Sequence, residues 1–164
     1  MKKALLISLF AFAMPIMAQA ETLIFPSEAP IASITFPDSW SPKETETGVD
    51  ATSDDSAVYL SADIADGKSI EKVTEDAILF LQENDVTIDP ATLRETPVEE
   101  FNGMNMTSLE WDGKDVDGPV SIVLAFFQTS DAKALVVTYW GTKGDEDKHS
   151  DALAGILASL HLSK

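Results

Sequence analysis

The segment from Gly118 to Gly141 constrains the fold most, because it is the least polar long stretch after the first twenty residues. It reads as two strands joined by a polar turn over residues 128–133. From Val120 to Phe127, apolar side chains occupy both sets of alternating positions. Alternate residues of a strand point to opposite faces, so both faces of this strand require a cover. The segment therefore predicts the centre of a sheet with further elements packed on both sides.

Weaker patterns on either side of this hairpin predict its neighbours. Alternating runs indicate strands over residues 31–36, 43–55, 57–64, 92–101 and 104–111, and an extended arm or edge strand over residues 21–33. Asn102-Gly103 is a two-residue hairpin signal. Apolar residues at helical spacing predict helices over Ser69–Asn84 and Asp145–Leu160. We expect an α+β fold of order β-β-β-α-β-β-β-β-α, with an antiparallel sheet of six to seven strands flanked by two helices.

The first twenty residues have the three parts of a secretory signal. Two lysines follow the initial methionine, an apolar run covers residues 4–18, and Ala18-Gln19-Ala20 supplies the small residues for signal peptidase. We expect cleavage between Ala20 and Glu21, which leaves residues 21–164 as one exported domain in the periplasm (or secreted). An uncleaved membrane anchor is the competing reading, but the run is short and carries Pro15. No membrane insertion is expected after cleavage.

Charge and cysteine content narrow the possible functions. The chain has 28 acidic residues against 11 basic ones and a net charge of −17. Such a surface repels phosphate backbones, so nucleic-acid binding is not expected. The absence of cysteine excludes a lipid-modified cysteine, disulfides and thiolate metal sites. Solubility, a cationic partner and a loosely held divalent ion are all compatible with the acidic balance.

Four features of the chain occur together. The segment Ile34-Thr35-Phe36-Pro37-Asp38-Ser39-Trp40 is a strand that leads into a proline, two small or polar residues and a tryptophan. A helix follows the early strands, a hydrophobic hairpin ends in Tyr139-Trp140, and an amphipathic helix comes last. Together these features resemble the PsbP-like group, which includes DcrB-like periplasmic domains. The resemblance covers Ile31 to Leu162 and implies an α/β/α sandwich with a non-catalytic accessory role, since members bind or assemble other proteins. It assigns no functional residue.

No catalytic constellation is evident in the residues. His149 and His161 are the only histidines, and the neighbours Ser150 and Asp151 of His149 point to different sides of a helix. No P-loop, dinucleotide fingerprint or zinc-ligand spacing occurs. We therefore expect neither an enzyme nor a cofactor, and we hold a hydrolase as a minor alternative.

Two groups of residues are candidates for binding. Asp112, Asp115 and Asp117 form a weak candidate for a calcium loop, because the EF-hand pattern breaks at both ends and an acidic hairpin turn explains them as well. Phe25 and Trp40 are candidates for a partner-binding edge, because they are large apolar residues in proline-punctuated segments. Core packing is the alternative for Trp40. The expected function is binding or assembly of an unidentified protein partner; a periplasmic binder of a small ligand or divalent cation is the alternative.

Overall fold

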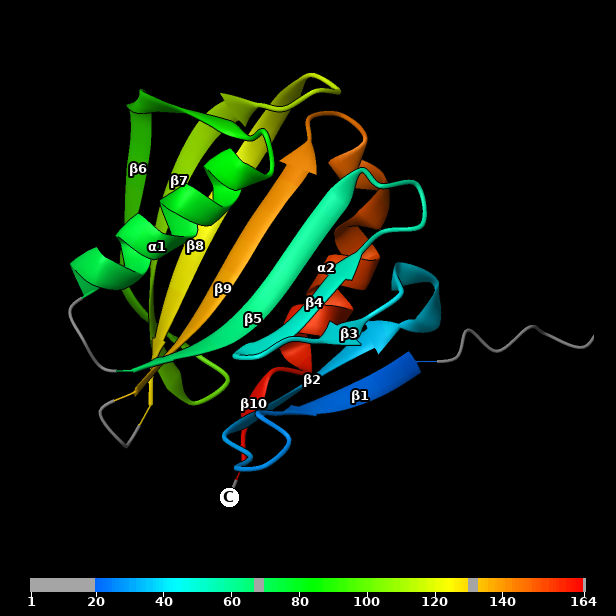
Figure 1. Ribbon diagram of the computed structural model, residues 1–164, viewed down its shortest axis with the longest axis vertical. Coiled ribbons are helices and arrows are strands. Elements are labelled where there is room, and N and C mark those ends of the chain that lie inside the picture. The colour runs from blue at the N-terminus through cyan, green and yellow to red at the C-terminus, as the bar shows by residue number, and fades with distance from the viewer. Residues whose placement is uncertain (1–19, 67–69, 130–132, 164) are drawn as a thin grey trace, which may run out of the picture.

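The structure is a computed structural model that describes residues 20–66, 70–129 and 133–163. Seven antiparallel strands form its main sheet in the order β3-β4-β5-β9-β8-β7-β6 (Figure 1). Their bounds are β3 Lys43–Glu44, β4 Gly48–Thr52, β5 Val58–Asp66, β6 Thr87–Phe101, β7 Met104–Lys114, β8 Pro119–Gln128 and β9 Lys133–Thr142. The early strands lie on one side of the β8–β9 hairpin and the β6–β7 hairpin on the other, as the sequence predicts.

The β8–β9 hairpin is covered on both faces, as its double apolar pattern predicts. On one face Ile122 and Leu124, both fully buried, belong to a core cluster that includes Leu81 of the first helix. On the other face Phe127 and Leu135 belong to a larger cluster that includes residues of the second helix. In Figure 1 the first helix lies in front of the sheet and the second behind it. The two helices therefore cover opposite faces of the hairpin.

The helices agree with the predicted positions, with one change. The first, α1, spans Ile70–Glu83, and the expected start at Ser69 lies outside the described residues. The second was expected to be continuous from residue 145, but it begins with the 3-10 turn η2 (Glu146–His149) before α2 (Ser150–Ala158). A further 3-10 turn, η1, spans Asp38–Trp40.

A second, smaller sheet was not predicted and corrects the expected element order. It has the order β1-β2-β10, with bounds β1 Ala20–Phe25, β2 Ala32–Pro37 and β10 His161–Leu162. It packs with α2 on the same face of the main sheet, and its fully buried residues Phe25, Ile34 and Phe36 join that core cluster. The predicted strand over residues 31–36 therefore belongs to a separate sheet. The predicted strand over residues 43–55 is two short strands, β3 and β4.

The β6–β7 turn also holds the end of α2. Asn102 and Gly103 have φ angles of 50° and 77°, the left-handed conformation that the predicted Asn-Gly turn requires. The Asn102 side-chain amide donates hydrogen bonds to the carbonyls of Leu157, Ala158 and Leu160 at 3.1, 3.3 and 2.9 Å. Carbonyls at a helix end have no partner within the helix, so this amide caps α2 from another element.

The described residues contain no helix that is long and apolar enough to cross a membrane. The expected signal segment, residues 1–19, lies outside the described residues. Ala20 and Glu21, which flank the expected cleavage point, are the first two residues of β1.

Candidate functional site

On the face of the main sheet that carries α1, the side chains change from apolar to polar across the width of the sheet. Under α1, β7, β8 and β9 present buried apolar side chains such as Trp111, Ile122 and Leu124. Farther across, β4, β5 and β9 present polar side chains on the same face. In the register, Ser61 lies opposite both Asp50 and Thr138. A row of three polar residues therefore crosses three neighbouring strands.

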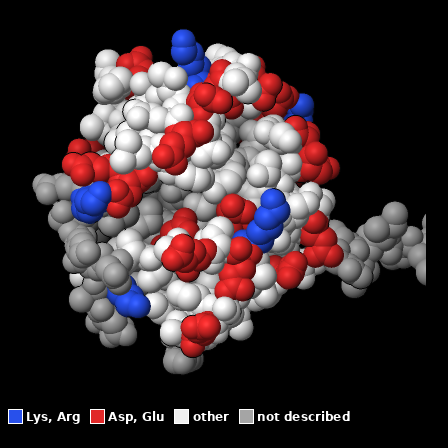
Figure 2. Space-filling model, viewed as in Figure 1, with Lys and Arg blue, Asp and Glu red and all other residues white. Residues whose placement is uncertain are grey.

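A groove lies over these polar strands, between α1 and the β3–β4 turn, with a volume of about 950 Å³. Its floor is formed by β4, β5 and β9, and its two walls by α1 and by the residues between β3 and β4. The groove is lined by residues of three regions: Asp50, Tyr59, Ser61, Asp63, Val136 and Thr138 on the floor, Lys72, Asp76, Ala77 and Phe80 on α1, and Thr45, Glu46 and Thr47 on the opposite wall. Figure 2 shows this face, with a hollow beside α1 and carboxylates spread around it.

The Asp63 carboxyl on the groove floor accepts hydrogen bonds from three side chains. Its Oδ1 accepts hydrogen bonds from Thr47 Oγ1 at 2.8 Å and Thr45 Oγ1 at 3.5 Å. Its Oδ2 accepts a hydrogen bond from Ser61 Oγ at 2.8 Å. Three hydroxyls, one from β5 and two from the β3–β4 turn, therefore hold the carboxyl group in one orientation.

Burial changes the acidity of this carboxyl. Desolvation raises the pKa of Asp63 above its usual 3.8, although the hydroxyl donors of Thr47, Ser61 and Thr45 act in the opposite direction. Burial also raises the pKa of Tyr59, and the nearby Asp50 carboxylate adds to that rise. A cleft that contains titratable groups with shifted pKa values is a candidate site on physical grounds.

Three aromatic rings pack together at one end of the groove, and two of them, Tyr59 and Phe80, line it. Tyr59 and Trp140, which are paired across β5 and β9, stack with ring centroids 4.1 Å apart. Phe80 of α1 lies over this pair, with centroid distances of 5.8 Å to Tyr59 and 6.2 Å to Trp140. The rings give the groove an apolar end beside its polar floor and hold α1 against the sheet.

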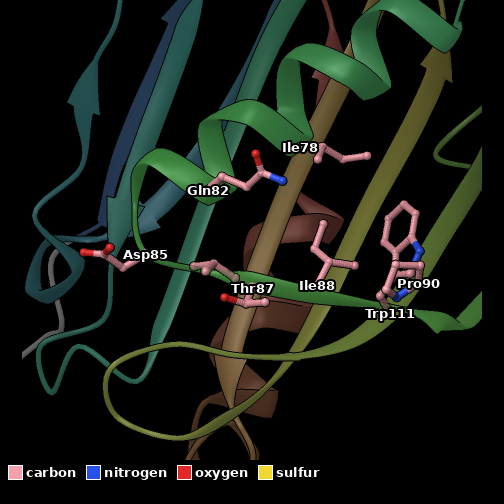
Figure 3. Close-up of a pocket in the computed structure, with 8 residues that line it drawn as sticks. Ile78, Gln82, Asp85, Thr87, Ile88, Pro90 and Trp111 are labelled. Carbon is pink, nitrogen blue, oxygen red and sulfur yellow. The ribbon is translucent and has the colours of Figure 1, made fainter.

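A second, smaller hollow of about 490 Å³ lies at the other side of α1, against β6 and β7. Ile78, Ile88 and Trp111 approach one another there, as Figure 3 shows, and Gln82 and Asp85 lie at its rim. Its lining is mainly apolar and lacks a group of converging polar side chains like that around Asp63. The groove is therefore the better candidate for a binding site.

The carboxylates near the end of β7 and in the β7–β8 turn form ion pairs and hydrogen bonds within the protein. Asp112 accepts contacts from Arg94 Nη2 at 3.3 Å and Lys143 Nζ at 3.0 Å, and these cations lower its pKa. Asp115 Oδ1 accepts the backbone N–H groups of Asp117 and Gly118 at 2.9 and 3.0 Å. The contacts of Asp112 and Asp115 agree with the acidic-turn reading, and calcium binding by Asp112, Asp115 and Asp117 stays an untested prediction.

A different group has metal-ligand spacing. Within the part of the chain that the structure describes, Asp54, Asp55 and His149 bring three possible ligand atoms within 4.8 Å of one another. The Asp55 carboxylate, however, already accepts hydrogen bonds from Ser53 Oγ, Ala57 N and His149 Nε2, at 2.8, 3.0 and 2.9 Å. These bonds lower the pKa of Asp55 and join the β4–β5 turn to η2. These contacts indicate that Asp55 and His149 connect two parts of the fold, which explains their proximity without a metal ion.

Phe25 and Trp40, the predicted partner-binding residues, lie in the interior. Phe25 is fully buried and Trp40 is 2% exposed, and both belong to the larger core cluster. The Trp40 ring meets His149 edge to face at 5.6 Å. Neither side chain offers surface to a partner in this conformation, so a partner-binding role for this edge stays a prediction that needs its own test.

The groove was not predicted from the sequence, although the residues of β5 carry a signal for it. Val58, Leu60 and Ala62 alternate with Tyr59, Ser61 and Asp63, so one face of the strand is apolar and the other is polar. A half-polar strand beside a hairpin that is apolar on both faces indicates that the cover stops at that strand. Locating the groove also required the position of α1.

Comparisons with known proteins identify the fold. No family model and no curated protein matches the sequence. Cyanobacterial PsbP (CyanoP) from Synechocystis sp. PCC 6803 is similar in structure, with a TM-score of 0.58 and 12% identity over 94% of this chain and 99% of that chain. LpqN, which is involved in cell envelope biogenesis of Mycobacterium tuberculosis, has a TM-score of 0.50 and 12% identity over 89% of this chain and 91% of that one.

A protein from Bacteroides thetaiotaomicron is also similar, with a TM-score of 0.55 and 16% identity. The match covers 87% of this chain and 48% of that one. The chain therefore has the PsbP-like fold that its sequence features indicated. The additional β1-β2-β10 sheet is the main difference from the expected arrangement.

Proposed function

We propose that this protein is an exported, non-catalytic binding domain, formed by residues 21–164, that holds a small ligand in the groove beside α1. The observation that carries the proposal is the groove's floor, where the Asp63 carboxyl is oriented by three hydroxyls under a cavity of about 950 Å³. Converging polar groups in a partly apolar cleft are the usual form of a small-molecule site. The PsbP-like fold and the signal-like start of the chain support the export and accessory parts of the proposal.

The groove's chemistry favours binding over reaction. Its described lining offers hydroxyls, carboxyls and two lysines but neither histidine nor cysteine. The three hydroxyls that hold Asp63 all donate to its carboxyl, and no histidine of the described lining lies between a hydroxyl and a carboxyl as in a nucleophilic triad. The oxygen atoms of these hydroxyls and of the carboxyl can still accept hydrogen bonds from a ligand.

Nuclear magnetic resonance of the uniformly ¹⁵N-labelled domain tests the proposal with a library of small fragments. Hits are expected to shift the backbone amides of Ser61, Asp63 and Thr138, on the groove floor. The amides of β6, on the far edge of the sheet, serve as the internal control. A library whose hits shift only amides outside the groove would overturn the assignment of this site.

A protein partner is the second candidate, and one observation favours it. The edge strand β6 exposes two large apolar side chains, with Leu93 45% and Val98 68% exposed. Its pairing with β7 is interrupted at two places, between Asp89 and Arg94 and between Thr96 and Glu99. Exposed apolar groups on an edge strand are a means of recruiting another chain.

Photo-crosslinking in intact cells tests this second candidate. A photoreactive amino acid at position 98 is expected to capture a partner, whereas the same amino acid at position 116 is not. Val116 is the matched control, because it is 82% exposed and lies in the β7–β8 turn, at the opposite end of β7 from the part that pairs with β6 around Val98. Equal capture at both positions, or none at either, would argue against a partner at β6.

The proposed export is tested by the position at which the signal segment is cleaved. Cleavage after Ala20 removes only the first residue of β1 and leaves Glu21 to pair with Phe36. Sequencing of the mature N-terminus is expected to read Glu-Thr-Leu, and a mature chain that retains Met1 would contradict the proposal.

A further inference from the structure

We infer that the ligand of the groove is a small organic cation, a protonated amine whose charged end meets Asp63 and whose apolar part lies toward Phe80. This inference rests on the proposed function, because it names the ligand class of the same site. Four observations lead to it: the missing counter-ion of Asp63, the charge of the lining, the aromatic end and the spacing of the carboxylates.

The first observation is the environment of the Asp63 carboxyl. All three of its side-chain partners are neutral hydroxyls, and within the described residues no lysine, arginine or histidine lies within ion-pair distance. A carboxylate that is partly removed from water without a counter-ion carries a desolvation cost. The raised pKa of Asp63 reflects that cost. A bound cation would offset the cost, which provides a free-energy gain that a neutral or anionic ligand cannot obtain.

The second observation is the charge of the lining. Glu46, Asp50, Asp63 and Asp76 contribute four carboxyl groups, whereas Lys72 and Lys133 contribute two amines. Lys72 forms an ion pair with Asp76 on the next turn of α1, which removes both from the balance. The remaining lining has three acidic groups and one basic group. The potential in the groove therefore attracts cations, and the net charge of −17 acts in the same direction.

The third observation separates an organic cation from a hydrated ion. The groove has an apolar side formed by Ala77, Phe80 and Val136, next to the ring of Tyr59. Apolar and aromatic side chains bind the hydrocarbon part of an amine, while its ammonium group meets Asp63. A bare metal ion would gain nothing from this side.

The fourth observation concerns the spacing of the carboxylates. Calcium requires several oxygen ligands around one point. Within the described residues, Asp54, Asp55 and His149 bring three possible ligand atoms within 4.8 Å of one another, whereas no three acidic groups of the groove do so. The acids of the groove are spread along it, which suits an elongated organic cation.

Three probes of similar shape test the inference: phenethylamine as the cation, 2-phenylethanol as the neutral analogue and phenylacetate as the anion. Their binding is measured by calorimetry and by shifts in the amide spectrum of the labelled domain. Phenethylamine is expected to bind most tightly, to shift the amides of Ser61, Asp63 and Thr138, and to weaken as salt is added. Asp63→Asn is expected to weaken phenethylamine roughly tenfold, the loss of one charge-assisted contact.

Asp117→Asn is the matched control, because Asp117 is exposed in the β7–β8 turn and its removal changes the net charge equally. It is expected to leave the affinity for phenethylamine within about twofold, as screening of distant charges predicts. A preserved amide spectrum in both variants shows that each has folded. An Asp63→Asn variant that binds phenethylamine as tightly as the unmodified protein overturns the inference.

The probes also separate this inference from the proposed function. Groove shifts with 2-phenylethanol, phenylacetate or calcium chloride, but not with phenethylamine, would overturn the cationic ligand and leave the groove as the binding site. If none of the four probes shifts the groove amides at millimolar concentration, the cationic inference is overturned, whereas the fragment library decides the proposed function.

Discussion

The two halves of the sheet face that carries α1 share only the strand β9, and they differ in the polarity of the side chains that they present. In the covered half, β7 and β8 present Trp111, Ile122 and Leu124 to the helix, and Ile122 and Leu124 are fully buried. In the open half, β4 and β5 present Asp50 and Asp63 to the groove. The β9 strand belongs to both, with Val136 toward the covered half and Thr138 on the groove floor.

The difference shows how side-chain polarity determines where a helix cover ends. A helix gains free energy by burying apolar surface, and it gains nothing over a row of carboxyl and hydroxyl groups. Phe80, at the boundary, packs on the aromatic pair Tyr59 and Trp140 and not on the polar row. The open half is therefore left accessible by the polarity of alternate residues in β5. Four substitutions can break or sharpen this comparison.

The largest effect is expected from Leu124→Ala in the covered half. Leu124 is fully buried between β8 and α1, so truncation leaves a cavity and should reduce the free energy of unfolding by about 2–5 kcal/mol. Urea denaturation followed by circular dichroism measures the change. Leu93→Ala is the matched control, since Leu93 is 45% exposed on β6 and should lose far less. Equal losses would mean that α1 does not cover this half as described.

Phe80→Ala is expected to have the next largest effect, because Phe80 lies at the boundary of the two halves. The ring is partly buried, so loss of its contacts with Tyr59 and Trp140 should cost roughly 1–2 kcal/mol. Thermal and urea unfolding measure the loss. Leu79→Ala, on the same helix but 54% exposed, serves as the control. If the Leu79 variant loses as much as the Phe80 variant, the aromatic contact does not anchor α1.

Asp63→Asn should change the pH dependence of stability in a way that is specific to the open half. The pKa of Asp63 is raised in the folded state above its usual 3.8, so its contribution to stability is complete below that pH and is lost as the pH rises through the folded pKa. The variant lacks this loss. Its stability relative to the unmodified protein should therefore increase from about pH 3 to pH 7, as measured by urea unfolding at several pH values.

Asp55→Asn is the control, because its stability relative to the unmodified protein should change with pH in the opposite direction. Hydrogen bonds from Ser53 and Ala57, and then from His149, lower the pKa of Asp55 below 3.8. The stability that its carboxylate contributes is therefore present above pH 3.8 and is lost as the pH falls through the folded pKa. This variant should be less stable than the unmodified protein near neutral pH, with a deficit that shrinks in acid. Parallel pH profiles of the two variants would contradict the described environments.

Ser61→Ala is expected to have the smallest effect on stability. The Ser61 hydroxyl donates to Asp63 Oδ2, so its removal should raise the pKa of Asp63 further and cost about 1 kcal/mol of stability. Titration of the Asp63 carboxyl carbon by nuclear magnetic resonance measures the pKa. Ser39→Ala, an exposed serine of η1, should leave it unchanged. A lowered Asp63 pKa in the Ser61 variant would refute the hydrogen bond.

The sequence predicted the covered half well because that half depends on local patterns. Alternation in β8 and β9 indicated two faces that need covers, and helical spacing over residues 69–84 supplied one of them. Asn102-Gly103 identified the β6–β7 turn. These signals extend over short segments, and the residues that form them contact one another or lie on the same element.

The open half and the small sheet could not be predicted in the same way. The groove exists because one side of α1, from Lys72 to Phe80, lies beside the polar strands, and no local sequence pattern reports where a helix lies across a sheet. The two-residue strand β10 is too short to have a recognisable period, and its partner β2 lies more than a hundred residues away in the chain. Trp40 was ambiguous, because large aromatic residues occur both in cores and at binding edges.

The pairing of β10 with β2 has a consequence for the order of events in folding. The β2 strand has β1 on one edge and β10 on the other, so its second row of hydrogen bonds is completed only by His161 and Leu162. Closing so long a loop is slow compared with forming the local hairpins β6–β7 and β8–β9. The small sheet should therefore be the last part to become protected from amide exchange. Until His161 and Leu162 pair with it, β2 has unpaired backbone groups along the edge that faces away from β1.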